Sequence, residues 1–499
     1  MKLKQLLCAA LAALMILPLA ACGDTGEGTG STEASATGNA AASDTESDSE
    51  TKETLDLEDK TFDGFELVFV TRDESEWSTV EIVPEENSEF VNIAEAVTER
   101  NEIIKTKYGV TLGEIKTDNG SYASKVNNEI IAPTGDFQAI VSSMANAAGF
   151  VRNGALVDLA GETCSSYIDL NKSWWDRKMS ESLAIEGKVY FATGDILTSD
   201  NDATFMMMFN KKVATETKLG DLYQMVNNGT WTMDTMYSMA QLAVNDKDGD
   251  GKLAYDSDVA GFAYTVDAPY CLMYAGGLQI IKRDSDDSLT YELDIKRADN
   301  IAAKTRLLFD KSLTVDINNT GATSVVVSGQ KCFGEEHALF MGECMQCVSR
   351  MRNYDVDFGI LPFPKYDESQ TNYFSIMHLT GGVVSIPKSM QGESLERVAY
   401  LLEAISYYSV DTLTHLYYDL NLKTKNAKDA ESGPMIDLIL ANRVYDVAYT
   451  YRLNNVVDNI AAAMLPSGKK NVASMERASK SGIERGLKNL LRDIQKSEK

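Results

Sequence analysis

The sequence predicts an α/β fold that is divided into two lobes. From Phe65 to Val141, short apolar runs alternate with amphipathic segments, which is the pattern of parallel strands connected by helices. About 440 residues follow Thr61, more than a single hydrophobic core accommodates. Between Gly187 and Lys212, two apolar runs are joined by a short polar segment, as expected where a strand pair crosses from one core into another. A plain hairpin within one domain is the alternative for this stretch.

The N-terminus predicts an exported lipoprotein. Residues 6–19 form an apolar run that follows Lys2 and Lys4 and is too short for a permanent membrane anchor. The run ends in Leu-Ala-Ala-Cys, which resembles the bacterial lipobox, so residues 1–21 are predicted to be a signal peptide and Cys22 to be lipidated. An ordinary secretory signal that contains a cysteine is the alternative. We expect the mature protein on the outer face of the cytoplasmic membrane, held there by its lipid.

Residues 22–60 are predicted to form a disordered acidic tether behind the lipidated cysteine. Small, hydroxyl-bearing and acidic side chains dominate this segment, which has almost nothing to bury. The tether contributes to a formal net charge of -27 for the whole chain. Because nucleic-acid binding needs a basic face, this balance excludes nucleic acid as a partner.

The cysteines argue against a disulfide framework. Of the seven in the sequence, Cys8 belongs to the predicted signal peptide and Cys22 is the lipidation site, so an odd number remains. Cys344 and Cys347 form a lone C-x-x-C, and no second pair or neighbouring histidine completes a metal site. We interpret the remaining thiols as buried and reduced. A metal half-site or a redox pair is the alternative for the C-x-x-C.

The first lobe is predicted to alternate strands and helices. The expected elements are strands at 65–70, 110–115 and 137–141, a helix at 89–108, and a helix capped by Ser121 that ends before Pro133. This order gives right-handed parallel crossovers. Ligands of such sheets bind outside the carboxyl ends of the strands. Those ends are Arg72 and Asp73 after the first strand, and Ser142 after the third.

Short motifs follow one another along most of the chain. They are YGV at 108–110, GDF at 135–137, GALVDL at 154–159, WWD at 174–176, GKVY at 187–190, FNK at 209–211, GTWTMD at 229–234, DFGILP at 357–362 and SIP at 385–387. Each motif is weak alone. Their order and spacing, behind a lipobox and an acidic tether, resemble the family 1 extracellular solute-binding proteins of ABC importers. The resemblance runs from about Phe65 to at least Ala404.

The resemblance implies a two-lobe periplasmic-binding-protein fold of type II, with an interlobe cleft and a largely helical C-terminal part. The first lobe would hold residues 61–195 and 375–409, and the second lobe residues 196–374 and 410–499. It also implies a receptor that captures a mono- or oligosaccharide and delivers it to the permease subunits of an ABC importer. Such a receptor is expected to be a monomer, without enzymatic activity and without a required cofactor.

Candidates for ligand contact follow from the resemblance and from position in the chain. Tyr270 matches a cleft aromatic that stacks on sugar, with core packing as the alternative role. Glu343 is expected at a strand end that faces the cleft, Trp77 in a loop beyond the first strand, and Asp195 in the first crossing between lobes. The predicted binding set is therefore Arg72, Asp73, Trp77, Ser142, Asp195, Tyr270 and Glu343.

Three other tryptophans and one histidine are left out of this set. Trp174 and Trp175 occupy a place that is structural in the family, and Trp231 starts a helix. His378 lies in the predicted second crossing, where its ring could donate to a sugar hydroxyl. We favour a core histidine whose polar atoms are satisfied within the protein.

One acidic loop resembles the start of an EF-hand. Carboxylates occupy alternate positions and Gly251 fills the sixth place, as in a calcium-binding loop. The twelfth place, where a bidentate glutamate is expected, is Ser257. The candidate calcium ligands are Asp246, Asp248, Asp250, Lys252, Asp256 and Asp258. A structural calcium site and a plain acidic surface turn are the two interpretations.

Catalytic signatures are scarce in the sequence. It has no nucleophile-elbow, zinc-protease, P-loop or dinucleotide motif, and its three histidines stand apart from metal-ligand spacing. A glycoside hydrolase needs only two carboxylates, and no spacing in sequence identifies such a pair. A secreted lipoprotein glycoside hydrolase is therefore the alternative to a binding receptor.

Overall fold

The computed structural model describes residues 53–73, 81–84, 91–320, 324–418, 430–468 and 471–497. The chain divides into two units, Met1–Lys52 and Glu53–Lys499, and the described residues all belong to the second. The predicted signal peptide, Cys22, most of the predicted tether and Trp77 lie outside the described residues. Within the described part, no helix combines the length and the apolar character needed to cross a membrane.

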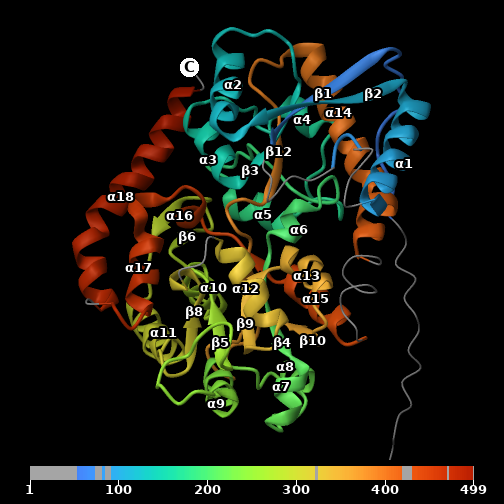
Figure 1. Cartoon of the computed structure of the whole chain (residues 1–499). Helices are drawn as coiled ribbons and strands as arrows, with labels where there is room; N and C mark the ends of the chain where they lie inside the picture. Colours follow the sequence, from blue (N-terminus) through green and yellow to red (C-terminus); the bar gives the residue numbers. More distant parts are fainter. Residues whose placement is uncertain are drawn as a thin grey trace, which may run out of the picture. The chain divides into compact units, whose positions relative to one another are not determined.

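The first sheet has four strands in the order β12-β3-β1-β2 (Figure 1). The central strand β1 (Phe65–Asp73) pairs in parallel with β2 (Val110–Asp118) and with β3 (Ala139–Ser143). The late strand β12 (Gly382–Ser385) joins the sheet antiparallel to β3. The predicted alternation of strands and helices along the chain is confirmed, as is the parallel pairing. The carboxyl ends of β1 and β3 therefore lie at the same edge of the sheet.

The crossover helices α1 (Val91–Tyr108) and α2 (Asn119–Ile131) lie between these strands, as predicted. The prediction that Ser121 caps α2 is wrong. The cap is Asp118, whose carboxylate accepts a hydrogen bond from the Ser121 amide at 3.0 Å. An aspartate satisfies a first-turn amide as well as a serine does, so the helix begins directly after β2.

The second sheet has five strands in the order β10-β4-β9-β5-β8. Strand β5 (Ala260–Tyr264) is parallel to β8 (Thr314–Asp316) and to β9 (Ala338–Cys344). Strand β4 (Phe205–Asn210) is antiparallel to β9 and to β10 (Phe358–Leu361). Every residue of β4 is buried, as its unbroken apolar run predicts. An unbroken apolar run is typical of a strand in a parallel sheet, but both neighbours of β4 run antiparallel to it.

Two segments of the chain pass between the sheets and run alongside each other. Isolated antiparallel bridges join Ala192 to Val384 and Thr204 to Met377. The first segment contains the short helix α6 (Ser199–Asp202) and leads into β4. The second segment leads into β12. The lobe boundaries inferred from the sequence stay predictions.

The apolar run at 189–192 does not form the predicted strand. The Val189 amide donates to the Asp158 carboxylate at 3.0 Å, and the Val189 carbonyl accepts from the Leu159 amide at 2.6 Å. These hydrogen bonds to a distant turn take the place of the hydrogen bonds that would pair the run with a neighbouring strand. The run therefore forms only the isolated bridge at Ala192.

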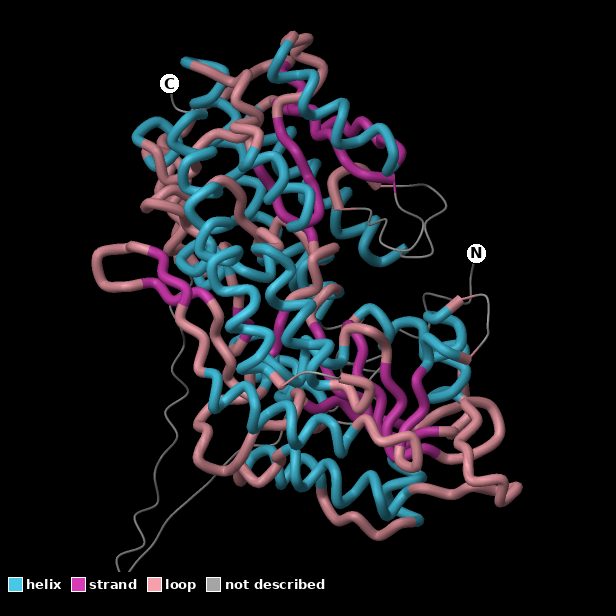
Figure 2. Tube along the Cα trace, turned by 90° about the vertical axis from the view of Figure 1, so that its left-hand side faces the viewer, coloured by secondary structure: helices cyan, strands magenta, loops and turns pink. Residues whose placement is uncertain are grey.

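Helices surround both sheets (Figure 2). Helix α14 (Gly392–Ser409) packs on α1, and the C-terminal helix α18 (Val472–Ser497) contacts α3, α11 and α17. The other described α-helices and strands are α3 (Met144–Arg152), α4 (Glu162–Ser165), α5 (Arg177–Leu183), α7 (Lys211–Glu216), α8 (Leu222–Asn227), α9 (Met233–Ala243), α10 (Ala268–Ala275), β6 (Ile281–Arg283), β7 (Leu289–Tyr291), α11 (Ile295–Leu308), α12 (Val325–Gly334), α13 (Gln346–Arg350), β11 (Ser375–Ile376), α15 (Ser432–Ala441), β13 (Arg443–Val444), α16 (Val447–Thr450) and α17 (Val456–Met464).

The tryptophans left out of the binding set belong to the core. Trp174, Trp175 and Trp231 are 1 %, 4 % and 0 % exposed. The Trp175 indole donates to the Glu403 carboxylate at 2.7 Å, and the Trp231 indole donates to a backbone carbonyl at 2.9 Å. The cysteines of the described chain are free and buried, in line with their interpretation as buried thiols.

Candidate functional site

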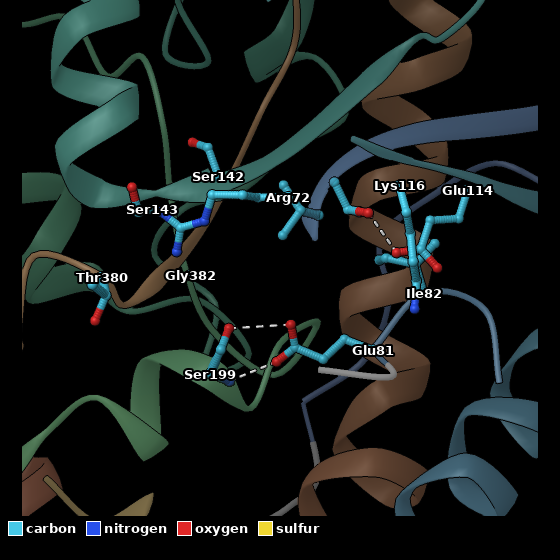
Figure 3. A pocket seen from close by; sticks show the side chains of 12 residues that line it. Arg72, Glu81, Ile82, Glu114, Lys116, Ser142, Ser143, Ser199, Thr380 and Gly382 are labelled. Carbon is cyan, nitrogen blue, oxygen red and sulfur yellow. Dashed lines mark hydrogen bonds between the residues drawn. The ribbon is translucent and has the colours of Figure 1, made fainter. Parts of the chain in front are cut away.

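A polar cavity lies at the carboxyl ends of β1 and β3 (Figure 3). This first cavity has about 530 Å³ of empty space, part of which is open solvent. Its place is the one that the strand order predicts, because ligands of parallel sheets bind beyond the strand ends. Hydroxyl groups are prominent in its lining, which includes Thr71, Ser142, Ser143, Ser199 and Thr380.

The structure brings the predicted Arg72 and Ser142 together in the first cavity. In Figure 3, the Arg72 side chain passes Ser142 and its guanidinium lies between Ser143 and Gly382. Ser142 is 3 % exposed, and its hydroxyl has no hydrogen-bond partner within the described chain. A buried hydroxyl of this kind is destabilising until a ligand or water satisfies it, so Ser142 is suited to a polar ligand. Asp73 is exposed and does not line the cavity.

Glu81 forms part of the same lining and was not predicted. It is 2 % exposed, and its carboxylate accepts hydrogen bonds from the amides and hydroxyls of Thr198 and Ser199 at 2.5 to 3.1 Å. The buried Arg100 guanidinium donates to the Glu81 carbonyl at 2.6 Å. These bonds fix the segment after β1 against the start of α6. No local motif marks Glu81, because its partners are distant in sequence.

A second cavity lies between α10 and the segment that precedes α17. It has about 570 Å³ of empty space, part of which is open solvent. Its lining residues are Asp267, Tyr270, His378, Leu379, Ala448, Tyr449, Arg452, Asn455, Val457 and Asp458. The predicted Tyr270 is half-buried, and its hydroxyl donates to the Asp458 carboxylate at 2.9 Å. The ring centroids of Tyr270 and Tyr449 are 6.1 Å apart. The second cavity therefore offers aromatic and charged groups side by side.

One short segment contributes to both cavities. Thr380 lines the first cavity, and His378 lines the second. The His378 Nδ1 atom accepts a hydrogen bond from the Thr380 amide at 3.2 Å and lies 2.6 Å from the Thr380 hydroxyl. The Nε2 atom lies 3.7 Å from the Asp267 carboxylate. Burial lowers the pKa of His378 and raises the pKa of Asp267. Because Nδ1 accepts from the Thr380 amide, a neutral His378 ring carries its proton on Nε2, the atom that faces Asp267.

Glu343 and Asp195 line neither of these two cavities. Glu343 stands near the end of β9, as predicted, and its carboxylate accepts a hydrogen bond from the next backbone amide at 3.0 Å. Asp195 accepts from the Thr414 hydroxyl at 2.8 Å. Burial raises the pKa of each carboxyl to about 7. Their roles in binding stay predictions.

Sequence reasoning missed most of the second cavity. Asp267 stands directly before α10, two positions ahead of Pro269, so the motif that identified Tyr270 could have drawn attention to it. Tyr449 and Arg452 approach from the C-terminal helices, far along the chain from Tyr270. Only tertiary packing places them there.

The acidic loop gathers three of the candidate calcium ligands. One carboxylate oxygen from each of Asp246, Asp248 and Asp250 lies within 4.8 Å of the others. Asp256 lies 3.7 Å from a lysine amino group. Asp258 is 2 % exposed and accepts hydrogen bonds from two backbone amides of the loop at 3.0 and 2.8 Å. Calcium binding stays a prediction, with the first three carboxylates best placed as ligands.

We expect excess calcium to raise the Tm relative to excess chelator. An ion that binds only the folded state stabilises it, by about 2.7 kcal/mol when the free ion is at 100 times its Kd. Asp248→Asn should abolish the difference, whereas Asp286→Asn, in an exposed turn elsewhere, should leave it intact. Scanning calorimetry in calcium and in chelator measures both. Equal Tm values for the parent chain would rule out the calcium interpretation.

Buried carboxyls are expected to make the protein less stable as the pH rises. Burial, with the charges of Glu81 and Asp200, raises the pKa of Asp202 to about 7, although the Tyr417 hydroxyl donates to it at 2.6 Å. The unfolded carboxyl has a pKa of about 4. The folded state therefore binds more protons between about pH 4 and 7, and this contribution to stability is lost as the pH rises through that window.

The urea midpoint of unfolding should accordingly be higher at pH 5.5 than at pH 8. Asp202→Asn should reduce the difference, because an amide keeps the hydrogen bond but does not titrate. Asp136→Asn, at an exposed position, is the control and should leave the difference unchanged. If the urea midpoint of Asp202→Asn changes between pH 5.5 and pH 8 as much as that of the parent chain, Asp202 is not the group whose titration causes the change.

Several solved structures with the same fold are solute-binding proteins. The cyclic alpha-maltosyl-1,6-maltose binding protein of Arthrobacter globiformis superimposes with a TM-score of 0.55 at 13 % identity, covering 85 % of this chain and 99 % of that chain. An ABC substrate-binding protein from Listeria monocytogenes in complex with cycloalternan gives 0.52 at 12 % identity, covering 87 % and 99 %. The chain has the fold of ABC-transporter solute-binding proteins. A solute-binding protein from Agrobacterium radiobacter K84 in complex with ribitol gives 0.51 at 12 % identity, covering 85 % and 100 %.

This solute-binding fold is the two-lobe type II architecture that the sequence predicts, with one sheet in each lobe. The predicted resemblance is thereby confirmed at the level of the fold. No protein-family model matches the chain, and no curated protein sequence matches it. The structures named above are of binding proteins, so they lend no support to the glycoside hydrolase alternative.

Proposed function

We propose that this chain is an extracellular receptor that captures a carbohydrate and delivers it to an ABC permease. The observation that carries the proposal is the pair of polar cavities linked by the segment from His378 to Thr380. Sugars need such a mixture, because their hydroxyls donate and accept hydrogen bonds while their C–H faces pack on aromatic rings. Proteins with the same fold are complexed with cycloalternan and ribitol, which are both rich in hydroxyls.

Capture is proposed to work by population shift. The first cavity is built largely on the first sheet, and the second on α10 and the C-terminal helices. A saccharide that contacts the residues of both cavities stabilises the conformation in which both sets of residues touch it. The permease would then recognise that arrangement. The ligand must make more contacts in one conformation than in the other, because a ligand that binds two conformations equally does not shift the equilibrium between them.

A thermal-shift panel tests the proposed ligand class. Cycloalternan, maltotetraose, ribitol and uronic acids are compared with a dipeptide and a metal chelate on the full chain. At least one saccharide or polyol is expected to raise the Tm, because it binds only the folded state. A rise with the dipeptide or the chelate, and with none of the saccharides, would contradict the proposal.

Lipid attachment at Cys22 is part of the same proposal. Cys22→Ala removes the thiol that would take the lipid, so we expect the protein to move from the membrane fraction to the culture medium. A single permanent anchor is lost in this variant, and the described residues offer no membrane-crossing helix in its place. Cys164→Ala, a buried thiol within the folded unit, is the control. Membrane retention of Cys22→Ala would show that another segment anchors the chain.

A further inference from the structure

Residues beside the second cavity hold an unusual backbone conformation. Arg452, Asn454 and Asn455 have φ values of 47°, 49° and 50°. This left-handed conformation is unfavourable for residues with a Cβ atom, although asparagine tolerates it better than most. Three such residues within one short segment persist only where the surrounding structure enforces them. Segments of this kind gather at binding sites, because the enforced shape presents side chains to a ligand.

Arg452 is the cation of this segment, and it lines the second cavity beside Asp267 and Asp458. Its side chain is exposed, and among the described residues its guanidinium makes no hydrogen bond and no ion pair. Asp267 faces His378 instead, and the Asp458 carboxylate accepts a hydrogen bond from the Tyr270 hydroxyl. A guanidinium only donates hydrogen bonds, and an ionised carboxylate only accepts them. A ligand of this cavity must therefore accept at Arg452 and donate at the carboxylates.

Helix α18 packs against the left-handed segment. Leu453 is 1 % exposed and belongs to the same core cluster as residues of α18. A Cβ atom at Gly482 would lie 2.5 Å from the Asn454 side-chain nitrogen and 3.0 Å from its Cγ. A Cβ atom at Gly486, about one turn later, would lie 3.8 Å from the Asn454 backbone nitrogen. The absence of side chains at these glycines lets α18 lie directly against Asn454, which does not line the cavity.

We propose that Arg452 selects the ligand in the second cavity, and that Asn454 and Gly482 are positioning residues that hold it in place. This inference rests on the proposed carbohydrate function and names a part of the substrate. Two neighbouring hydroxyl oxygens of the ligand accept hydrogen bonds from the guanidinium N–H groups of Arg452. Other hydroxyl groups of the ligand donate hydrogen bonds to the carboxylates of the cavity. Because the left-handed backbone is already fixed before binding, less conformational entropy is lost when the ligand binds.

The test measures Tm and affinity on the full chain, with cycloalternan, maltotetraose and ribitol as probes. Arg452→Lys keeps the charge but loses the planar fork, so we expect about tenfold weaker binding. Asn454→Gly frees the backbone without touching the cavity, and we expect a loss of about threefold or more without a fall in Tm. Gly482→Ala displaces the Asn454 side chain and should weaken binding similarly. Lys218→Gly, at another left-handed residue with φ 59° that lines neither cavity, is the matched control and should bind like the parent.

Distinct outcomes separate this inference from the proposed function. If a probe binds the parent chain and binds Asn454→Gly and Gly482→Ala equally well, the positioning role is wrong. If affinity falls only in step with Tm, the segment is structural and the inference is overturned. Unchanged affinity in Arg452→Lys contradicts selection by the guanidinium. If the dipeptide or the metal chelate binds the parent chain and no saccharide or polyol does, the proposed function has failed and the inference falls with it.

Discussion

Replacing Arg443 with alanine is expected to lower the free energy of unfolding by about 3–5 kcal/mol, because it leaves two buried carboxylates without their cation. Arg443 is 9 % exposed, and its guanidinium nitrogens lie 2.7 Å from Asp176 and 2.8 Å from Asp200. Asp200 belongs to α6 and is 1 % exposed, and Asp176 caps α5. The ion pairs therefore tie the first crossing segment to two distant parts of the chain.

The loss in Arg443→Ala should be larger at pH 8 than at pH 5. Burial raises the pKa of Asp200 to about 6 even beside Arg443, so this carboxyl is charged at pH 8 and largely protonated at pH 5. Removing the cation therefore leaves the additional buried charge of Asp200 only at the higher pH.

Urea unfolding at both pH values measures the effect of Arg443→Ala. Arg177→Ala is the matched control, because its partner Glu181 is one helical turn away and both side chains are well exposed. That change should cost no more than about 0.5 kcal/mol. If Arg443→Ala costs as little as Arg177→Ala, the buried cluster does not hold the crossing segment as described.

Tyr270→Ala is expected to weaken saccharide binding about 30-fold, or about 2 kcal/mol. The half-buried ring lines the second cavity, and its hydroxyl is held by Asp458 at 2.9 Å. A fixed ring offers a flat apolar face to the C–H side of a sugar at little cost in conformational entropy. Truncation removes that face and leaves the cavity wider. Isothermal titration with whichever saccharide raises the Tm measures the change.

Two variants show which part of Tyr270 matters. Tyr270→Phe keeps the ring and loses the bond to Asp458, so we expect a loss of only a few-fold. Tyr237→Ala, in α9 and outside both cavities, should bind like the parent chain. Parent-like affinity of Tyr270→Ala would mean that Tyr270 packs in the core and does not contact the ligand.

The fold was predictable where the period of apolar residues decides the structure. The run at Phe205–Asn210 is apolar almost throughout, and it forms the fully buried strand β4. The shorter run at 189–192 looks similar in sequence. It forms no strand, because Asp158 and Leu159 take its backbone hydrogen bonds. The spacing of apolar residues does not show which distant groups take a segment's backbone hydrogen bonds. It also does not show that β4 pairs antiparallel with both of its neighbours.

The candidate site was predictable only where a fold rule fixes a residue's place. Arg72 and Ser142 stand near the carboxyl ends of two strands that pair in parallel, so this pairing brings them to one cavity. Glu343 also stands near a strand end, but its carboxylate bonds to its own backbone. Arg452 carries no motif, and its place depends on a left-handed segment that α18 supports. Sequence reasoning thus found one side of the site and missed most of the other.

Isothermal titration of the full chain with cycloalternan, maltotetraose and ribitol tests the central claim most directly. We expect at least one of them to bind with one molecule per chain, and we expect Arg72→Ala and Tyr270→Ala each to weaken that binding. No heat of binding with any saccharide or polyol, together with saturable binding of a peptide or a metal chelate, would contradict it.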